Sequence, residues 1–236
     1  MYGHAQIDQT GSAGKSFPTI ASTFAPHART WDRDIPMQNI PGNYYDTYGT
    51  SHPIARTLMN GFLGAFDALV AKTGARRAYE VGCGEGHLSC RLLKGGISMR
   101  GSDLESVAVE EANLNTARLG FGRPFAVRSL YELSPSEASA DLVICCEVLE
   151  HLPDPNAALQ VLSRLAKPFL LVSVPREPIW RLLNLARGAY LSCLGNTPGH
   201  IQHWTSGSFT KLLQQHFEVV DLRHPLPWTM ALCRSR

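Results

Sequence analysis

The sequence predicts an α/β fold in which a doubly wound, mostly parallel sheet of seven strands ends in an antiparallel hairpin. Three observations predict it: short apolar runs alternate with helical patterns, a glycine-rich turn follows the first run, and only a proline-rich turn separates the last two runs. Strand–helix–strand alternation implies crossover connections, which make the strands parallel and cover both faces of the sheet. The last turn is too short for a crossover, so its two strands should pair antiparallel at one edge.

The individual elements follow from periodicity and from helix start and stop signals. An amphipathic helix should begin at Pro53, because proline suits a first helical position, and it should end near Gly74. The predicted strands are 77–81, 97–102, 125–130, 142–146, 169–174, 217–222 and 228–233. The predicted later helices are 86–94, 105–119, 154–166 and 206–216.

The 236 residues suit one core domain with attachments. Residues 1–40 are rich in Gly, Ser, Thr, Gln and Pro without periodicity and should form a flexible N-terminal tail, which leaves 41–236 as the main domain. Residues 11–16 imitate the end of a phosphate-binding P-loop. However, Gln9 stands where the first glycine of that motif belongs, and no apolar strand precedes it.

An insertion at 176–205 separates the fifth strand from the last helix and hairpin. Its helix is apolar nearly all round, so we expect it to cover a ligand, a partner subunit or the main core. The apolar residues are Ile179, Trp180, Leu182, Leu183, Leu185, Ala186, Tyr190 and Leu191.

Composition narrows the functional classes. Hydrophobic residues make up 44% and charged residues 18%, which indicates a globular chain rather than a disordered one. The 22 basic and 20 acidic residues are too evenly balanced to favour nucleic acid, so a small molecule is the expected partner. Six cysteines without a CxxC pair read as buried thiols in a reducing compartment. No leader-like segment and no run of about 18 apolar residues is evident, so we expect a cytoplasmic protein without a membrane span.

The strongest local signal is the run 80–86, Glu-Val-Gly-Cys-Gly-Glu-Gly, which follows a strand and opens a helix. Alternate glycines let the backbone turn sharply and approach a ligand closely. A dinucleotide-binding GxGxxG motif would need its third glycine at His87. The carboxylate of Glu80 would also repel a pyrophosphate, whereas it would favour a ligand that carries an ammonium and a sulfonium group.

Asp103 ends the second predicted strand, seventeen residues after Gly86. A carboxylate at this place can accept hydrogen bonds from both ribose hydroxyls of an adenosine ligand, and Leu104 would then lie along the adenine. Each feature alone has an ordinary structural explanation, since strand-terminal aspartates often cap helices. Together they predict a binding site for an adenosine-containing ligand.

With these motifs the chain, from about Tyr45 to its C-terminus, resembles the class I S-adenosylmethionine (SAM) dependent methyltransferases, which have a Rossmann-like fold. The run 146–155, Cys-Glu-Val-Leu-Glu-His-Leu-Pro-Asp-Pro, is similar to the E-x-L-E-H-x-x-D-P run of the small-molecule branch that includes ubiquinone-type O-methyltransferases. The resemblance implies SAM as the cofactor. The residues expected to bind it are Tyr48, Glu80, Gly82, Cys83, Gly84, Gly86, Asp103, Leu104, Ser129, Leu130, Cys146 and Glu147.

The absence of motifs that other methyltransferase classes carry restricts the class of methyl acceptor. Methyltransferases that act on the amino groups of bases carry an [DNS]-P-P-[YF] sequence that clamps the flipped base, and Cys146–Leu149 stand at those positions here. Cytosine C5 methyltransferases attack with a cysteine that follows a proline, and no cysteine follows a proline in this sequence. Catechol-type metal enzymes need a carboxylate cluster after strand four, where we interpret Glu147 as standing alone. We therefore expect neither a nucleic-acid substrate nor a metal.

The insertion closes with 199–205, Gly-His-Ile-Gln-His-Trp-Thr, which resembles a G-H-x-x-x-W-T segment beside the substrate pocket of related enzymes. His200 or His203 could be the general base for methyl transfer to a hydroxyl, or either could simply fix the loop. His151 is interpreted either as structural or as a group that supports the site from behind. A tyrosine-containing loop at 43–49 could cap the SAM pocket or anchor the tail.

The sequence therefore predicts a SAM-dependent methyltransferase that acts on an O or N atom of a small, partly apolar metabolite, and it leaves a homodimer open as the oligomeric state. Two alternatives remain open: a SAM-binding regulator without catalysis, and a nucleotide-binding oxidoreductase.

Overall fold

The structure is a computed structural model, and it describes residues 52–236. The predictions for the tail at 1–40, for the P-loop-like run at 11–16 and for the tyrosine loop with Tyr48 lie outside the described residues.

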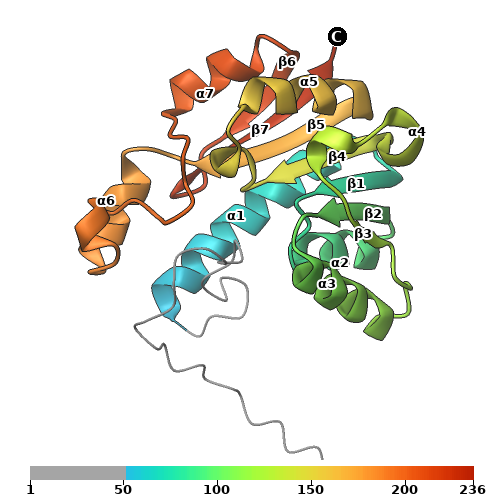
Figure 1. Cartoon of the computed structure of the whole chain (residues 1–236), viewed down its shortest axis with the longest axis horizontal. Coiled ribbons are helices and arrows are strands. Elements are labelled where there is room, and N and C mark those ends of the chain that lie inside the picture. The colour runs from blue at the N-terminus through green and yellow to red at the C-terminus, as the bar shows by residue number, and fades with distance from the viewer. Residues whose placement is uncertain (1–51) are drawn as a thin grey trace, which may run out of the picture. The chain divides into compact units, whose positions relative to one another are not determined.

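The described residues form one seven-stranded sheet in the order β3-β2-β1-β4-β5-β7-β6 (Figure 1). The strands from β1 to β5 are parallel, while β7 runs antiparallel to both β5 and β6, so the predicted fold class is confirmed. The C-terminal hairpin forms one edge, with β7 between β5 and the edge strand β6. The strands are β1 Arg77–Val81, β2 Ser98–Asp103, β3 Phe125–Val127, β4 Ala140–Cys146, β5 Ala166–Pro175, β6 Phe217–Arg223 and β7 Trp228–Ser235.

Helices cover both sides of this sheet. Figure 1 shows α1, α2 and α3 on one side and α4, α5 and α7 on the other, as right-handed crossovers between parallel strands require. The helices are α1 Pro53–Ala71, α2 His87–Lys94, α3 Ser106–Arg118, α4 Pro135–Ala138, α5 Pro155–Leu165, α6 Ile179–Ala186 and α7 Ser206–Leu213. Short 3₁₀ turns are η1 Leu130–Glu132, η2 Leu149–His151 and η3 Leu191–Cys193.

The sheet divides the hydrophobic core into two clusters, one on each face, and strand β4 contributes side chains to both. Its side chains alternate between the two faces because successive residues of a strand point in opposite directions. Val143 and Cys145 join the cluster that contains α5 and α7, whereas Ile144 and Cys146 join the cluster that contains α1 and α2. The adjacent cysteines are therefore packing residues on opposite faces, as the sequence predicts.

Helix α1 is the one described helix that is long and apolar enough to cross a membrane. Phe62, Phe66 and Leu69 on one of its faces are fully buried against the sheet, and Phe62 contacts the Trp228 ring edge-on with centroids 5.0 Å apart. Because these apolar side chains pack against the sheet, the apolar composition of α1 is explained by its role as a core helix.

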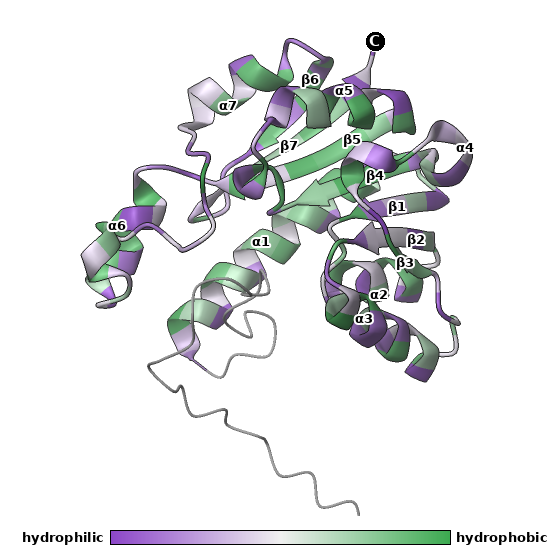
Figure 2. Ribbon diagram, viewed as in Figure 1, coloured by the Kyte–Doolittle hydropathy of each residue, from purple (hydrophilic) through white to green (hydrophobic). Residues whose placement is uncertain are grey.

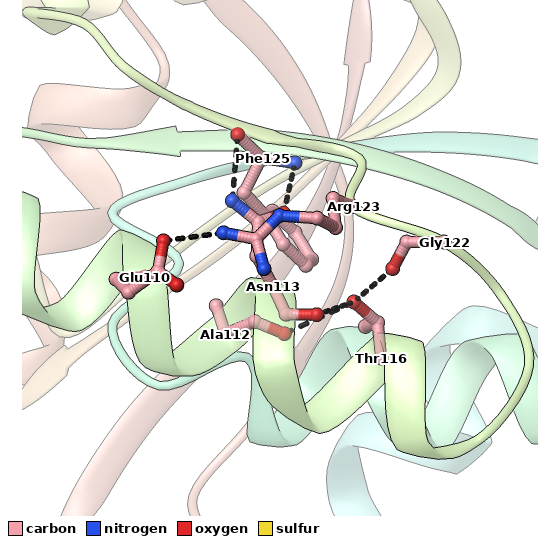
Figure 3. Close-up of polar contacts among 7 residues, drawn as sticks. All are labelled: Glu110, Ala112, Asn113, Thr116, Gly122, Arg123 and Phe125. Atoms are coloured by element: carbon pink, nitrogen blue, oxygen red, sulfur yellow. Dashed lines mark hydrogen bonds and ion pairs between the residues drawn. The ribbon is translucent and has the colours of Figure 1, made fainter.

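A polar network fastens the edge strand β3 to α3 (Figure 3). The Asn113 side chain donates to the carbonyl of Phe125 and accepts from its amide, both at 3.0 Å. Thr116 donates to the Gly122 carbonyl at 2.9 Å, and Arg123 pairs with Glu110. These contacts compensate for the shortness of β3. The predicted strand 125–130 ends early because the Ser129 side chain accepts the amide of Tyr131 and starts η1.

The insertion differs most from expectation. Asn184 is the one residue of α6 that is buried, and it donates to the Gly195 carbonyl at 2.8 Å, which ties the insertion to itself. Trp180 is the residue of α6 that packs against the main core. Leu182, Leu191 and Leu194 are 59%, 61% and 73% exposed, and Figure 2 shows hydrophilic residues among the hydrophobic ones along α6. Much of the apolar surface of the insertion is thus uncovered within the described part of the chain.

Candidate functional site

The glycine-rich turn after β1 is held by backbone hydrogen bonds. The amides of Gly82 and Cys83 both donate to the carbonyl of Ser102 on β2, at 2.8 and 3.0 Å, and the Gly86 amide donates to Cys83 at 2.9 Å. The three glycines have φ angles of +73°, +49° and +78°, which other residues rarely adopt. The run therefore forms the sharp strand-to-helix turn that its glycines predict.

Each glycine faces different surroundings. A Cβ atom on Gly82 would lie 2.3 Å from a methyl group of Val148, and one on Gly86 would lie 3.1 Å from the Cβ of Ala112. Both positions are therefore packed against protein. A Cβ atom on Gly84 would meet no atom within 4 Å, so this glycine faces open space from which a ligand can approach the backbone.

Asp103 connects the glycine-rich turn to the end of β2. One carboxylate oxygen accepts the Gly84 amide at 2.9 Å, and the other accepts the Glu105 amide at 3.0 Å. A carboxylate offers about four lone-pair positions, so the two oxygens can still accept further hydrogen bonds from a ligand. The contacts of Asp103 with the backbone are therefore compatible with the predicted ligand-binding role, and Asp103 is not the N-cap of α3, which is Glu105.

Glu80 lies beneath this turn at the end of β1. Its side chain is buried and accepts a hydrogen bond from the Ser89 hydroxyl of α2. Burial raises the pKa of Glu80 from 4.5 to about 8; the Ser89 hydrogen bond opposes this shift and the nearby charge of Asp103 adds to it. A cation bound beside Glu80 would favour its charged form.

The other residues predicted to bind the cofactor divide into exposed and buried ones. Leu104 is 63% exposed beside Asp103, so its side chain is available to a ligand. Ser129 caps η1, and Leu130 is buried in the main core. Cys83 and Cys146 are also buried. Those three buried side chains pack against protein, and a ligand would meet mainly their backbone.

Glu147 follows β4 in a left-handed conformation with φ of +58°, which is unusual for a residue other than glycine. Its amide donates to the Ser173 carbonyl at 3.1 Å. Its two carboxylate oxygens accept from the Ser173 hydroxyl at 2.8 Å and from the Trp228 indole at 2.7 Å. Burial raises the pKa of Glu147, and these two hydrogen bonds oppose the shift. Strained backbone with a fixed carboxylate is typical of a functional position.

A second cluster of polar side chains lies beside Glu147. Two of its members, Glu150 and His151, belong to η2, and the third, His200, comes from the insertion. Glu150, His151 and His200 each offer one ligand atom, and these atoms lie within 4.8 Å of one another. The backbone brings them together, because the amides of Ile201 and Gln202 both donate to the Glu150 carbonyl, at 2.9 and 3.0 Å. The closing segment of the insertion is therefore fastened to the turn after β4.

The two candidate histidines have different surroundings. His200 is 8% exposed, and its ring stacks on Trp180 and meets His151 edge-on. Burial, with smaller effects of His151 and His203, lowers the pKa of His200 to about 3, so its ring is neutral near pH 7. His203 is exposed, and its Nε2 lies 2.8 Å from the Asn196 side-chain oxygen. Burial also lowers the pKa of His203.

The structure thus brings most of the predicted residues to one edge of the sheet. The glycine-rich turn, Asp103 and Glu147 lie at the carboxyl ends of β1, β2 and β4, where ligands of open α/β sheets bind. Glu150 was not among the residues that the sequence predicts for the site, and His151 was expected to have a structural or a supporting role. The spacing of Glu147 and Glu150, three residues apart on a tight turn, was the available signal.

Comparisons with known proteins bear on the family and the fold of the chain. A profile of the methyltransferase domain family matches residues 79–168. A ubiquinone biosynthesis O-methyltransferase from Paracidovorax citrulli is 39% identical over 110 residues, which are 45% of each chain. Another from Xanthomonas axonopodis pv. citri is 30% identical over 159 residues, 66% of each chain. The chain thus spans less than half the length of the first of these relatives.

Among solved structures, the magnesium protoporphyrin IX methyltransferase of Synechocystis with bound SAH superposes with a TM-score of 0.61. Its sequence identity is 21%, and the match covers 80% of this chain and 90% of that one, which establishes the shared fold. Residues 79–168 thus match the methyltransferase domain family, and the chain shares the fold of this solved methyltransferase.

Proposed function

We propose that the chain is a SAM-dependent methyltransferase that transfers a methyl group to an oxygen or nitrogen atom of a small, partly apolar metabolite. The observation that carries the proposal is the pairing of Asp103 with the open glycine turn. The Asp103 carboxylate holds the Gly84 amide, and Gly84 itself faces open space. This arrangement combines a ribose acceptor with a surface that lets a ligand approach the backbone.

The residues present fit SAM better than a dinucleotide. Glu80 and Glu147 add carboxyl groups at the ends of β1 and β4, and carboxyl groups there would stabilise a cationic ligand and repel a pyrophosphate. We infer that Asp103 holds the ribose hydroxyls, that Leu104 lies along the adenine, and that the backbone near Cys146 and Glu147 meets the methionyl part. When bound, SAM supplies the methyl group as an electrophile.

The contribution of the chain to the rate is then mainly positional. The hydrogen bonds that Ser173 and Trp228 donate to Glu147 hold this carboxyl group, at the end of β4, in one position. A rigid site that holds the acceptor atom in line with the methyl group gains most of its rate from orientation. Residues 176–205 supply the side of the site where we place the acceptor, since His200 and Trp180 come from that insertion.

An oxygen acceptor is favoured over nitrogen. Both curated relatives described above are O-methyltransferases of ubiquinone biosynthesis, and the exposed leucines of the insertion suit an acceptor with apolar surface.

The test is incubation of the purified chain with methyl-labelled SAM and a fractionated cell extract, followed by identification of the labelled product. Label in a small molecule supports the proposal. SAM that binds but is never consumed would instead indicate a regulator without catalysis. Tight binding of NAD without binding of SAM would indicate an oxidoreductase.

A further inference from the structure

Arg176, the first residue of the insertion, is a cation without a counter-charge in the described part of the chain. It is half-buried, and its Nε atom is buried without a hydrogen-bond partner. No ion pair among residues 52–236 includes it. Arg91 and Arg123, by contrast, are exposed to solvent and are nevertheless paired with carboxylates. Because arginine keeps its charge in a protein, Arg176 needs an anion that these residues do not supply.

The backbone holds Arg176 in position at the carboxyl end of β5. Its amide donates to the Pro227 carbonyl at 2.9 Å, and its carbonyl accepts the Trp180 amide at 3.0 Å. It also forms a β-bridge with Trp204, the residue before the N-cap of α7. Three segments therefore position Arg176: the turn between β6 and β7, the start of α6 and the segment before α7.

The side chain of Arg176 belongs to the face of the sheet that α7 covers (Figure 1). Val172 and Val174 lie in the same core cluster as Phe209 of α7, and Arg176 continues their alternation one step beyond β5. Partial burial lowers the pKa of His224, and the charge of Arg176 adds to this shift, so the two side chains are close. His224 is exposed, which opens this position to solvent.

Hydrogen-bond donors surround this position. The Ser206 hydroxyl, in the first turn of α7, makes a hydrogen bond with Nε2 of His224. The first amides of a helix have no partner within the helix, and Gly207 of the same turn faces open space. Thr229, which pairs with Val174 and is fully buried on the same face, has a hydroxyl without a partner in residues 52–236. A guanidinium beside a helix N-terminus and hydroxyl groups is suited to a carboxylate or a phosphate.

The acidic residue next to Arg176 in the sequence does not neutralise it. Glu177 forms an ion pair with Arg181, whose Nε lies 3.5 Å from a carboxylate oxygen. The two arginines and the one glutamate therefore leave an excess of positive charge at the start of the insertion. This excess would attract the anionic end of a ligand.

The distance from Glu147 indicates which ligand would carry the anion. Ser173, which donates to Glu147, lies three residues before Arg176. At about 3.3 Å per residue of strand, Arg176 lies about 10 Å farther along the chain, roughly the length of an aromatic acid. The carboxyl group of Glu147 would repel an anion at the methyl end, so an anionic group of the acceptor would point toward Arg176.

We propose that Arg176 binds the carboxylate or phosphate group of the methyl acceptor, which is therefore an anionic molecule with an apolar body. This inference rests on the proposed function and specifies its substrate class. The anion would accept hydrogen bonds from the guanidinium and from the first turn of α7, while the apolar body would contact Trp180. A neutral analogue would leave Arg176 unpaired and would be rejected for that reason.

Anion binding can be measured without methyl transfer. The purified full chain, with and without SAH, is titrated calorimetrically with benzoate and separately with inorganic phosphate at low ionic strength. We expect one anion per chain with millimolar affinity, because these fragments contain little more than the charged end of the acceptor. Arg176→Gln should weaken binding at least about tenfold, and Arg176→Lys should keep part of it.

Arg164→Gln is the matched control, because Arg164 is exposed on α5 and its loss changes the net charge of the chain by the same amount. It should bind both anions like the wild type. Without an anion, Arg176→Gln should melt at the temperature of the wild type or above it, since the variant removes a half-buried cation that has no partner. An arginine with only a structural role would give a lower melting temperature in this variant.

The labelled product of methyl transfer shows whether the anion belongs to the acceptor. We expect an anion-exchange resin to retain the labelled small molecule at pH 7. With that acceptor, Arg176→Gln should raise KM at least about tenfold and lower kcat less, while the affinity for SAM stays the same. Benzoate should compete with the acceptor and not with SAM.

The proposal is overturned if neither anion binds the wild type at about 10 mM, or if Arg176→Gln binds them as tightly as Arg164→Gln. A labelled product without negative charge would overturn it and leave the proposed function in place. An anion that binds through Arg176 without competing with the acceptor would be a separate ligand and would also overturn it. If anions bind through Arg176 but no small molecule takes up the label, the proposed function is wrong, and the assignment of the anion to a methyl acceptor is wrong with it.

Discussion

Replacement of Asp103 tests the cofactor site most informatively, because this side chain serves both the fold and the proposed ligand. Its oxygens accept the amides of Gly84 and Glu105 at 2.9 and 3.0 Å. Asp103→Ala removes both acceptors, whereas Asp103→Asn keeps one. The two variants should therefore form a graded series.

The expected magnitudes follow from these contacts. A hydrogen bond to a charged group contributes about 1.5 to 3 kcal/mol, and less where water competes, as at the half-buried Asp103. We expect Asp103→Ala to lower the free energy of unfolding by about 2 kcal/mol. Loss of the ribose acceptor should weaken SAM binding roughly ten- to a hundredfold in addition.

The assay is calorimetric titration of the folded variants with SAM, together with denaturant unfolding. Asp141→Asn is the control, because Asp141 also accepts two backbone amides, those of Arg76 and Arg77, through one carboxylate oxygen, while its other oxygen pairs with the Arg77 guanidinium, at the opposite end of the sheet. It should lose stability and keep SAM affinity. Unchanged SAM affinity in Asp103→Ala would refute the assigned role of this carboxylate.

Three further predictions concern the glycine turn, Glu80 and His203. Gly82→Ala would place a Cβ 2.3 Å from Val148 and should lower the free energy of unfolding by more than about 2 kcal/mol. Gly84→Ala should lower the free energy of unfolding by only about 1 kcal/mol and should weaken SAM binding, because its Cβ would occupy the open space beside the backbone. Denaturant unfolding and titration with SAM measure the two effects separately. Because the pKa of Glu80 rises from 4.5 to about 8 on folding, the native state holds the proton more tightly, so stability is fully present below pH 4.5 and falls as pH rises toward 8. Glu80→Gln should reduce the fall of the unfolding free energy with pH by up to about 1.4 kcal/mol per pH unit between pH 5 and 8. An unchanged pH dependence in this variant would contradict the raised pKa of Glu80. His203→Gln should keep kcat and mainly raise the acceptor KM, because a histidine that only fixes the loop affects binding rather than the chemical step. Since burial lowers the pKa of His203, this residue should add no pH dependence to the kcat of the wild type from pH 6.5 to 8; a hundredfold loss of kcat in the variant would instead identify His203 as the base.

Local sequence signals predicted the fold well because they are strong and repeated. Strand β1 has the predicted bounds, and the antiparallel hairpin follows from the short turn between β6 and β7. The end of β3 was missed because one side-chain hydrogen bond, from the Tyr131 amide to Ser129, outweighs the apolar pattern there.

The candidate site was predictable only where its residues are close together in the sequence. The glycine turn and Asp103 are joined by one strand pairing, β1 with β2, which the pattern implies. The meeting of Glu150 with His200 depends on two backbone hydrogen bonds, from Ile201 and Gln202, between distant segments. No periodicity encodes such contacts, so the second cluster became visible only in three dimensions.

The central claim is that the turn at 82–86 and Asp103 form a SAM site. The most direct measurement is calorimetric titration of the purified full chain with SAM, with SAH and, separately, with NAD. We predict that SAM and SAH bind at one site per chain with micromolar affinity, that they compete with each other, and that NAD does not bind. Binding of NAD in place of SAM, or binding of neither, would contradict the claim.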